Sequence, residues 1–184
     1  YDLQAIDISE LAGKSGFPVF VSNVADGKPV KVIRVPGGGK VSGTQLRKDT
    51  AAYADIVRAG GAKGLARIAL PENEAEEVKG PIGKYFTVDQ KLELFEKTGA
   101  QPGDLLLFLS DTGKIVYTAV DLLRRQIATE KNLGDPDVLA FSWVIDFPLV
   151  EWNEDEKRWD PSHHLFTSPM IEDLAKRILE VATY

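Results

Sequence analysis

The sequence predicts an α+β fold, in which an antiparallel or mixed sheet carries its helices on one face. Short apolar segments of strand length alternate with longer segments whose apolar residues recur at helical spacing. Their order is strand, strand, helix, strand, short strand, helix, strand, helix. The 184 residues contain no internal repeat, and 43% hydrophobic and 27% charged residues are ordinary for a globular protein. This length suffices for one sizeable domain, or for one domain and a piece of another.

The first elements form a predicted hairpin. Residues 2–11 mix apolar and acidic side chains and fit a short strand or a helical turn. Residues 17–22, with Pro18 near their start, and residues 29–35 both have strand composition. Asp26-Gly27 between them is a hairpin-turn signal.

A glycine-rich run and a helix follow. Residues 36–40 contain three glycines and a lysine, but they match neither the spacing of a phosphate-binding loop nor that of a dinucleotide-binding loop, so we expect a flexible connection. Ser42 and Gln45 predict a capping box that opens a helix. The buried face of this helix is predicted from Leu46, Thr50, Tyr53 and Val57, and its end from Gly60-Gly61.

The next segment is acidic. Residues 65–70 predict a short strand, residues 71–79 a solvated loop, and residues 80–86 a turn with another short strand. The loop allows two interpretations: an exposed charge run, which is the commoner case, or a metal site built from Glu72, Glu74, Glu76 and Glu77.

Two more helices flank the best strand candidate, residues 105–109, an unbroken apolar run typical of a central strand. Thr87 and Gln90 predict a capping box for the first helix, which ends near Gly99. Its predicted inner face comprises Val88, Leu92 and Phe95. The second helix ends near Gly134. Its predicted inner face comprises Val116, Val120, Leu123 and Ile127, and its predicted outer face Arg124, Arg125 and Lys131. Arg124 and Arg125 fit either an RNA contact or, more commonly, a solvated helix surface.

The C-terminal part contains all three tryptophans and both histidines. Residues 141–150 predict a buried strand, residues 153–157 a charged turn, and Arg158-Trp159 the returning strand. His163 and His164 follow. Chemistry alone leaves open a surface loop, polar recognition, catalysis with Ser162, and zinc binding, which is weakened because adjacent strand residues face opposite ways. After Pro169, a helix is predicted from Ile171, Leu174, Ile178 and Val181.

Composition narrows the classes of function. With a net charge of −6 and a pI near 5.0, the chain is a poor general binder of nucleic acid. The absence of cysteine excludes disulfides and thiol catalysis and fits the cytoplasm. No apolar run reaches the ~18 residues of a membrane span. The chain starts at Tyr1 rather than at methionine, so we expect a fragment of a longer protein.

Two sets of motifs resemble a known family. Trp143-Val-Ile-Asp-Phe-Pro148, Arg158-Trp159 and His163-His164-x-Phe-Thr-Ser-Pro169 resemble the class II catalytic domain of bacterial-type aspartyl-tRNA synthetases. Leu165 stands where that family usually has proline, and the tail after Pro169 departs from it. The middle of the chain resembles the GAD domain, inserted in the same synthetases, through Val32-Ile-Arg-Val-Pro-Gly-Gly38, Gly61-Ala-Lys-Gly-Leu-Ala66, Gly80-Pro-Ile-Gly-Lys84 and Gly103-Asp-Leu-Leu-Leu-Phe108.

The resemblance implies a domain organisation. Residues 15–134 would be a two-layer GAD-like (DCoH-like) insertion domain, and residues 1–14 an N-terminal flank from the catalytic domain. Residues 135–184 would be a further catalytic-domain segment, comprising a strand pair, the His-His loop and a C-terminal helix.

The resemblance also implies a function. The parent protein would use ATP and Mg²⁺ to join aspartate to tRNA(Asp) through aspartyl adenylate, as a cytoplasmic homodimer, and whether it also charges tRNA(Asn) stays open. His163 would bind L-aspartate, with His164 as a second candidate. This chain would hold no catalytic residue and no metal, and would be inactive alone. Two alternatives remain: a GAD-bearing subunit of a glutamyl-tRNA amidotransferase, and a non-catalytic tRNA-associated binding module.

Overall fold

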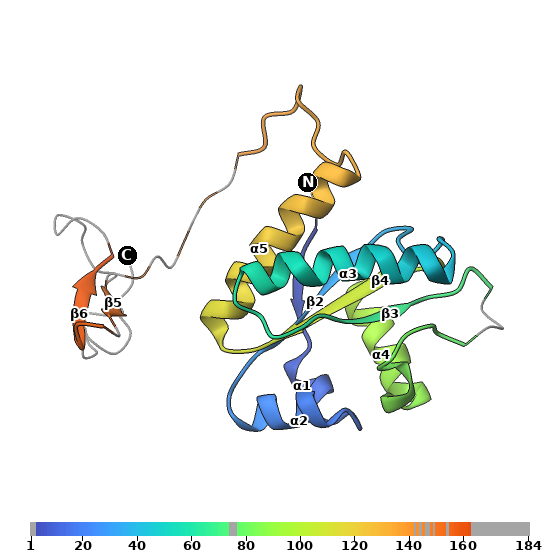
Figure 1. Cartoon of the computed structure of the whole chain (residues 1–184), viewed down its shortest axis with the longest axis horizontal. Helices are drawn as coiled ribbons and strands as arrows, with labels where there is room; N and C mark the ends of the chain where they lie inside the picture. Colours follow the sequence, from blue (N-terminus) through green and yellow to red (C-terminus); the bar gives the residue numbers. More distant parts are fainter. Residues whose placement is uncertain are drawn as a thin grey trace. The chain divides into compact units, whose positions relative to one another are not determined.

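The computed structural model describes residues 3–73, 77–141, 143, 145, 148, 150–153 and 155–162. The chain divides into two units, residues 1–135 and residues 136–184 (Figure 1). The first unit includes residues 1–14, which the resemblance assigns to a separate flank. Within the described ranges, no helix is long and apolar enough to cross a membrane.

A four-stranded antiparallel sheet forms the centre of the first unit. Its strands are β1 (Ala5–Asp7), β2 (Val30–Val35), β3 (Ala66–Ala69) and β4 (Leu105–Ser110), in the order β1-β2-β4-β3. β4 pairs with β2 on one side, from Val30↔Ser110 to Val35↔Leu105, and with β3 on the other. The predictions of strands near 29–35 and 65–70 and of a central strand at 105–109 are confirmed.

Helices cover both faces of this sheet, so the predicted one-sided arrangement of two layers is wrong, although the α+β class and the antiparallel sheet are confirmed. α3 (Gly43–Ala59) and α5 (Gly113–Glu130) pack on one face, where alternate strand residues such as Ile33 and Leu107 point. α1 (Ser9–Gly13), α2 (Pro18–Ala25) and α4 (Val88–Thr98) lie on the other, with Val32 and Phe108 (Figure 1). Cover on both faces explains why the β4 run is apolar without interruption.

The predicted strand over residues 17–22 is wrong, because these residues belong to α2. Pro18 occupies the first turn of this helix, where a missing N–H group removes no hydrogen bond. Gly27, at φ 73°, follows the helix end, so Asp26-Gly27 ends a helix instead of closing a hairpin. β2 pairs with β1 and β4 in place of the expected hairpin partner.

α3 begins at the predicted cap and presents the predicted face. The Ser42 hydroxyl accepts from the Gln45 N–H at 3.2 Å, whereas the Gln45 amide donates to Asp49 at 2.6 Å, so the cap is confirmed but not the reciprocal bond of a capping box. Tyr53 on the buried face donates to Glu130 of α5 at 2.7 Å. Burial and this hydrogen bond raise the pKa of Tyr53 well above its usual range. The buried face is confirmed for Leu46, Thr50, Tyr53 and Val57.

The glycine run at residues 36–40 is a packed turn instead of a loose connection. The Gly39 N–H donates to the Gly103 carbonyl at 2.8 Å, and a Cβ atom at Gly39 would lie 2.6 Å from the Asp104 carbonyl oxygen. The buried Asp104 carboxylate accepts from Gly37 N–H at 2.9 Å and from Arg34 Nε at 2.7 Å. Glycine is therefore required here for close backbone approach.

α4 has the predicted capping box but a different buried face. The Thr87 hydroxyl and the Gln90 side chain exchange both hydrogen bonds of the box. Leu94 is buried, whereas Val88 and Leu92 of the predicted inner face are 72% and 62% exposed. Phe95 of that face is partly buried against the core. Leu94 and the predicted residues Val88 and Leu92 all fit a helical pattern. Only the packing against the sheet therefore decides which side of α4 is buried. The strand predicted within residues 80–86 is also wrong, since a 3-10 turn at Gly83–Tyr85 stands there.

α5 buries the predicted residues Val116, Val120, Leu123 and Ile127. Arg124 is not simply solvated. It is half-buried, and its Nε donates to the carbonyl oxygen of Leu3. Arg125 is exposed and pairs with Asp121 at 2.7 Å.

The second unit contains a hairpin of β5 (Val150–Asn153) and β6 (Arg158–Pro161), which confirms the predicted turn and return. The rings of Trp152 and Trp159 meet edge to face across it, with centroids 5.6 Å apart. The predicted buried strand over 141–150 is confirmed at Val150, which starts β5, and is wrong for the described residues of 141–145. Phe141, Trp143 and Ile145 lie outside any strand and are 93%, 94% and 74% exposed. The predicted tail helix lies outside the described residues.

Candidate functional site

The predicted aspartate-binding residues, His163 and His164, lie outside the described residues, as do Leu165 and Pro169. The structure describes the hairpin that precedes them. Asp160 accepts from Asn153 Nδ2 at 2.7 Å and from Arg158 Nε at 2.8 Å, and these contacts lower the pKa of the Asp160 carboxyl. Ser162, the last described residue, has a buried hydroxyl oxygen without a hydrogen-bond partner in the described part of the chain.

The acidic loop forms no metal centre in its described part. Glu72 pairs with Lys40 at 3.2 Å, and Glu77 is exposed, while Glu74 and Glu76 lie outside the described residues. Among the residues that the structure describes, no three histidine, aspartate or glutamate side chains lie close enough to hold a metal ion.

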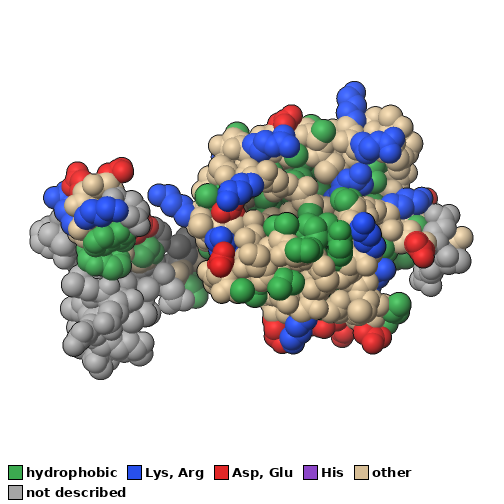
Figure 2. Space-filling view, turned by 60° about the horizontal axis from the view of Figure 1, so that its bottom comes forward, with side chains coloured by type: hydrophobic (Ala, Val, Ile, Leu, Met, Phe, Trp, Pro, Cys, Tyr) green, Lys and Arg blue, Asp and Glu red, His purple; other side chains and the backbone are tan. Residues whose placement is uncertain are grey.

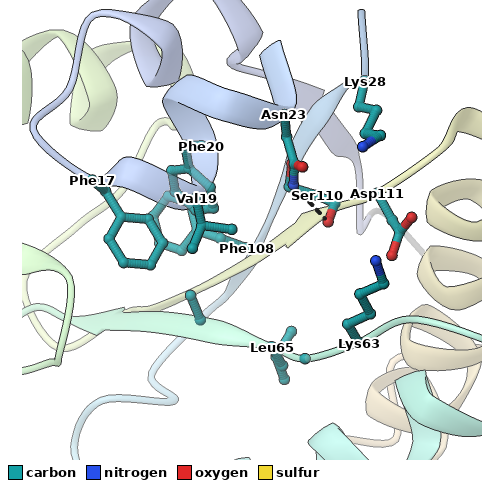
Figure 3. Close-up of a pocket in the computed structure, with 12 residues that line it drawn as sticks. Phe17, Val19, Phe20, Asn23, Lys28, Lys63, Leu65, Phe108, Ser110 and Asp111 are labelled. Carbon is teal, nitrogen blue, oxygen red and sulfur yellow. Dashed lines mark hydrogen bonds between the residues drawn. The ribbon is translucent and has the colours of Figure 1, made fainter. Parts of the chain in front are cut away.

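One cavity of the first unit lies between α2, the end of β4 and the residues that lead into β3 (Figure 3). Its volume is about 430 Å³. One end is aromatic: the rings of Phe17 and Phe20 meet edge to face with centroids 4.8 Å apart, and Phe108 of β4 lies 6.0 Å beyond Phe20. Val19 and Leu65 complete the apolar wall.

The other end of the cavity is polar. Asn23 donates to the Ser110 hydroxyl at 3.0 Å and thereby ties α2 to β4. Beyond this bond lie Lys28, Lys63 and Asp111, and the side chains of Lys63 and Asp111 extend toward each other (Figure 3).

The polar end carries charges of both signs. Asp111 is buried, and one of its carboxylate oxygens accepts from the Thr112 N–H at 2.8 Å. Lys28 pairs with Asp26 at 2.9 Å. Two ammonium groups, one of them paired with Asp26, and the Asp111 carboxylate therefore line this end, so it is not a simple anion site.

The sequence gives little signal for this cavity. Its residues come from four separate segments: 17–23, Lys28, 63–66 and 108–111. Phe17 and Phe20 have helical spacing, and they would stand out only once Pro18 is read as the start of a helix. The polar residues meet only because β4 ends beside α2.

Charge is distributed unevenly between the two units. Residues 1–135 contain 18 lysines and arginines and 18 aspartates and glutamates, whereas residues 136–184 contain 4 and 10. The whole acidic excess therefore lies in the second unit. Figure 2 shows the first unit from the side of α1 and α2, where Lys and Arg side chains surround a hydrophobic patch and acidic side chains lie toward the margins. The expectation of poor nucleic-acid binding from the net charge does not extend to the first unit.

Known proteins match the chain over nearly its whole length. The GAD domain model matches residues 20–120. The chain is 41% identical over 175 residues to a protein of Thermosynechococcus vestitus named aspartate–tRNA(Asp/Asn) ligase, covering 95% of the chain and 29% of that relative. It is 39% identical over 176 residues to the aspartate–tRNA ligase of Halalkalibacterium halodurans, again with 29% of the relative covered. The chain thus spans about 29% of the length of these relatives.

Proposed function

The chain belongs to the GAD domain family, and from this premise we propose that it is a segment of an aspartate–tRNA ligase. The observation that carries the proposal is the extent of the identity. It covers 95% of the chain, whereas the GAD match ends at residue 120. A GAD-bearing amidotransferase subunit would account for the GAD match but not for the similarity that continues beyond it.

The parent protein would catalyse two steps. The aspartate carboxylate attacks the α-phosphate of ATP, which gives aspartyl adenylate and releases pyrophosphate. A ribose hydroxyl at the end of the tRNA then attacks the adenylate and releases AMP. We propose that parts of the parent outside the described residues hold ATP and the metal.

Within this reaction, His163 is the proposed contact to L-aspartate. An imidazole can donate a hydrogen bond to a carboxylate or accept one from an ammonium group, so it can orient the substrate without entering the chemistry. The support is the match of His163-His164-x-Phe-Thr-Ser-Pro169 to the family motif and the hairpin that leads into it. His164 is the second candidate.

The partners follow from the reaction. We propose tRNA(Asp) as the nucleic-acid substrate of the parent protein. We also propose that the parent acts as a homodimer in the cytoplasm. Charging of tRNA(Asn) as well, as the name of the Thermosynechococcus vestitus relative states, is a separate activity that the same assay decides.

Aspartylation of tRNA by the whole parent protein tests the proposal. We expect His163→Ala to raise KM for L-aspartate about tenfold or more, because a hydrogen bond to a charged substrate is lost, and to leave KM for ATP unchanged. His164→Ala is the matched control and should have a smaller effect. The 184-residue chain alone should not aspartylate tRNA. An unchanged KM for aspartate in the His163 variant would refute the assigned role, and a parent without aspartylation activity would refute the function.

A further inference from the structure

We propose that the cavity between α2, β4 and residues 63–66 binds a free α-amino acid with an apolar side chain. This site goes beyond the proposed function, because the ligand differs in class from the acidic substrate aspartate. The inference rests on three properties of the cavity: a separated pair of opposite charges, an aromatic end and a matching size.

The separated charge pair favours a zwitterion. Lys63 and Asp111 extend toward each other across the polar end, yet no ion pair joins them within the described part of the chain (Figure 3). A simple anion placed between them would meet the Asp111 carboxylate, and a simple cation would meet Lys63 and Lys28. An α-amino acid carries an ammonium and a carboxylate on one carbon, so each charge can face its opposite.

Asp111 is suited to receive the ammonium group. Its carboxylate is buried at the end of β4, and the backbone of Thr112 donates to Oδ1 at 2.8 Å. This bond holds the side chain in place while Oδ2 can accept a further proton donor. Asn23 uses its amide N–H groups on Ser110, so its carbonyl oxygen can accept from the same ammonium group.

The aromatic end selects the side chain of the ligand. Phe17, Val19 and Leu65 offer apolar surface at this end, and Val19 is 53% exposed, whereas Phe20 and Phe108 are buried in the core of the unit. An apolar side chain there would remove apolar surface from water, whereas the carboxylate of aspartate would lose its hydration without a partner. The volume of about 430 Å³ lies in the range of small-molecule sites and suits leucine or phenylalanine.

An NMR titration of ¹⁵N-labelled 184-residue chain tests the site. The probes are L-phenylalanine, L-leucine, L-aspartate and two truncated forms of phenylalanine: phenethylamine, which lacks the carboxylate, and 3-phenylpropionate, which lacks the ammonium group. We expect phenylalanine or leucine to shift the amides of residues 17–23 and 110–112 with a millimolar or lower Kd. Aspartate and both truncated forms should bind at least about tenfold more weakly, since each lacks one charge-assisted contact or the apolar contact.

Two variants assign the charges to residues. Asp111→Asn keeps an oxygen for the Thr112 N–H. It should weaken the binding of phenylalanine at least about tenfold, but not the binding of 3-phenylpropionate. Lys63→Gln should weaken the binding of phenylalanine but not the binding of phenethylamine. Lys48→Gln, an exposed lysine on α3 outside the cavity, is the matched control and should change nothing. A variant that merely destabilised the fold would weaken all ligands alike.

Three results would overturn the proposal. The first is the absence of shifts with both phenylalanine and leucine. The second is equal binding of phenylalanine and 3-phenylpropionate, which would make the cavity an anion site. The third is tighter binding of AMP, titrated as a further probe, than of either amino acid. The test uses the isolated chain, which should lack ligase activity, so its outcome does not depend on the aspartylation assay.

Discussion

The two units differ in how far their described apolar residues are buried. The first unit brackets its sheet between helices, so β4 buries Leu105, Leu107 and Phe108 to within 2% of full burial. The second presents a two-stranded hairpin, and its described residues Phe141 and Trp143 are more than 90% exposed. A two-stranded hairpin alone is marginally stable in water. The core of the first unit therefore has its apolar partners within that unit, whereas the described residues Phe141 and Trp143 of the second unit remain exposed.

A core substitution gives the largest expected difference between the units. Leu107→Ala removes a side chain that is fully buried at the middle of β4 and should lower the free energy of unfolding of the first unit by about 3–4 kcal/mol. Urea denaturation followed by far-UV circular dichroism measures this loss. All three tryptophans lie in the second unit, so we expect the tryptophan fluorescence transition to stay in place.

The control for this experiment is Leu92→Ala on the exposed side of α4, which removes the same atoms from a residue that is 62% exposed. Its effect should stay below about 0.5 kcal/mol. A shift of the tryptophan transition together with that of Leu107→Ala would mean that the two units unfold as one.

The buried carboxylate of Asp104 gives the next largest effect. Asp104→Ala leaves Arg34 and the N–H groups of Gly37 and Gln101 without their acceptor, at a cost of about 2–3 kcal/mol. Asp104→Asn keeps one acceptor oxygen and should lose less. Chemical denaturation of both variants gives the comparison, and equal losses would show that charge decides the stability rather than the number of hydrogen bonds.

In the second unit, the paired rings of Trp152 and Trp159 should contribute less to stability than Asp104 does in the first unit. Trp159→Ala removes the ring contact with Trp152 and should weaken the hairpin by about 0.5–1 kcal/mol, without changing the unfolding of the first unit. Near-UV circular dichroism reports loss of the ring pair. Glu151→Ala, an exposed residue of β5, serves as the control. A retained near-UV signal in Trp159→Ala would argue that the pair is not formed in solution.

The smallest effect concerns pH and the attachment of β1. Burial raises the pKa of Asp7, but hydrogen bonds from Ser9 and the ion pair with Lys31 at 3.0 Å outweigh it, so the pKa lies below the ordinary 3.8. A lowered folded-state pKa means that the stabilisation is present above pH 3.8 and is lost as the pH falls through the folded-state value.

Asp7→Asn should therefore cost less than about 1 kcal/mol at pH 7, because the side chain is half exposed, and should cost nothing in strong acid. Thermal unfolding of both proteins across this pH range measures the difference. A constant difference at every pH would attribute the effect to hydrogen bonding alone.

Local signals predicted much of the first unit. The cap at Ser42, the box at Thr87 and the buried face of α5 follow from residues close in sequence, and the structure confirms them. Local signals did not distinguish a strand from α2, because Pro18 fits both a strand start and a first helical turn. They also did not select the buried face of α4, since Leu92 and Leu94 both fit a helical pattern.

The candidate sites show the same limit. The assignment of His163 comes from the match of residues 163–169 to a family motif. These residues lie outside those that the structure describes. The cavity beside α2 comes from the structure alone, because Asn23, Lys63 and Asp111 are brought together by the strand order and by no local pattern.

The bond between Arg124 of α5 and the carbonyl of Leu3 brings the start of the first unit beside its last helix (Figure 1). A module with neighbouring ends can be spliced into a surface loop of a host protein without forcing the two sides of that loop apart. For the same reason, a short linker could join the two ends, and new termini could be opened at an exposed turn such as Gly27. The sheet would then keep its strand order while the chain ran through it from a different starting point.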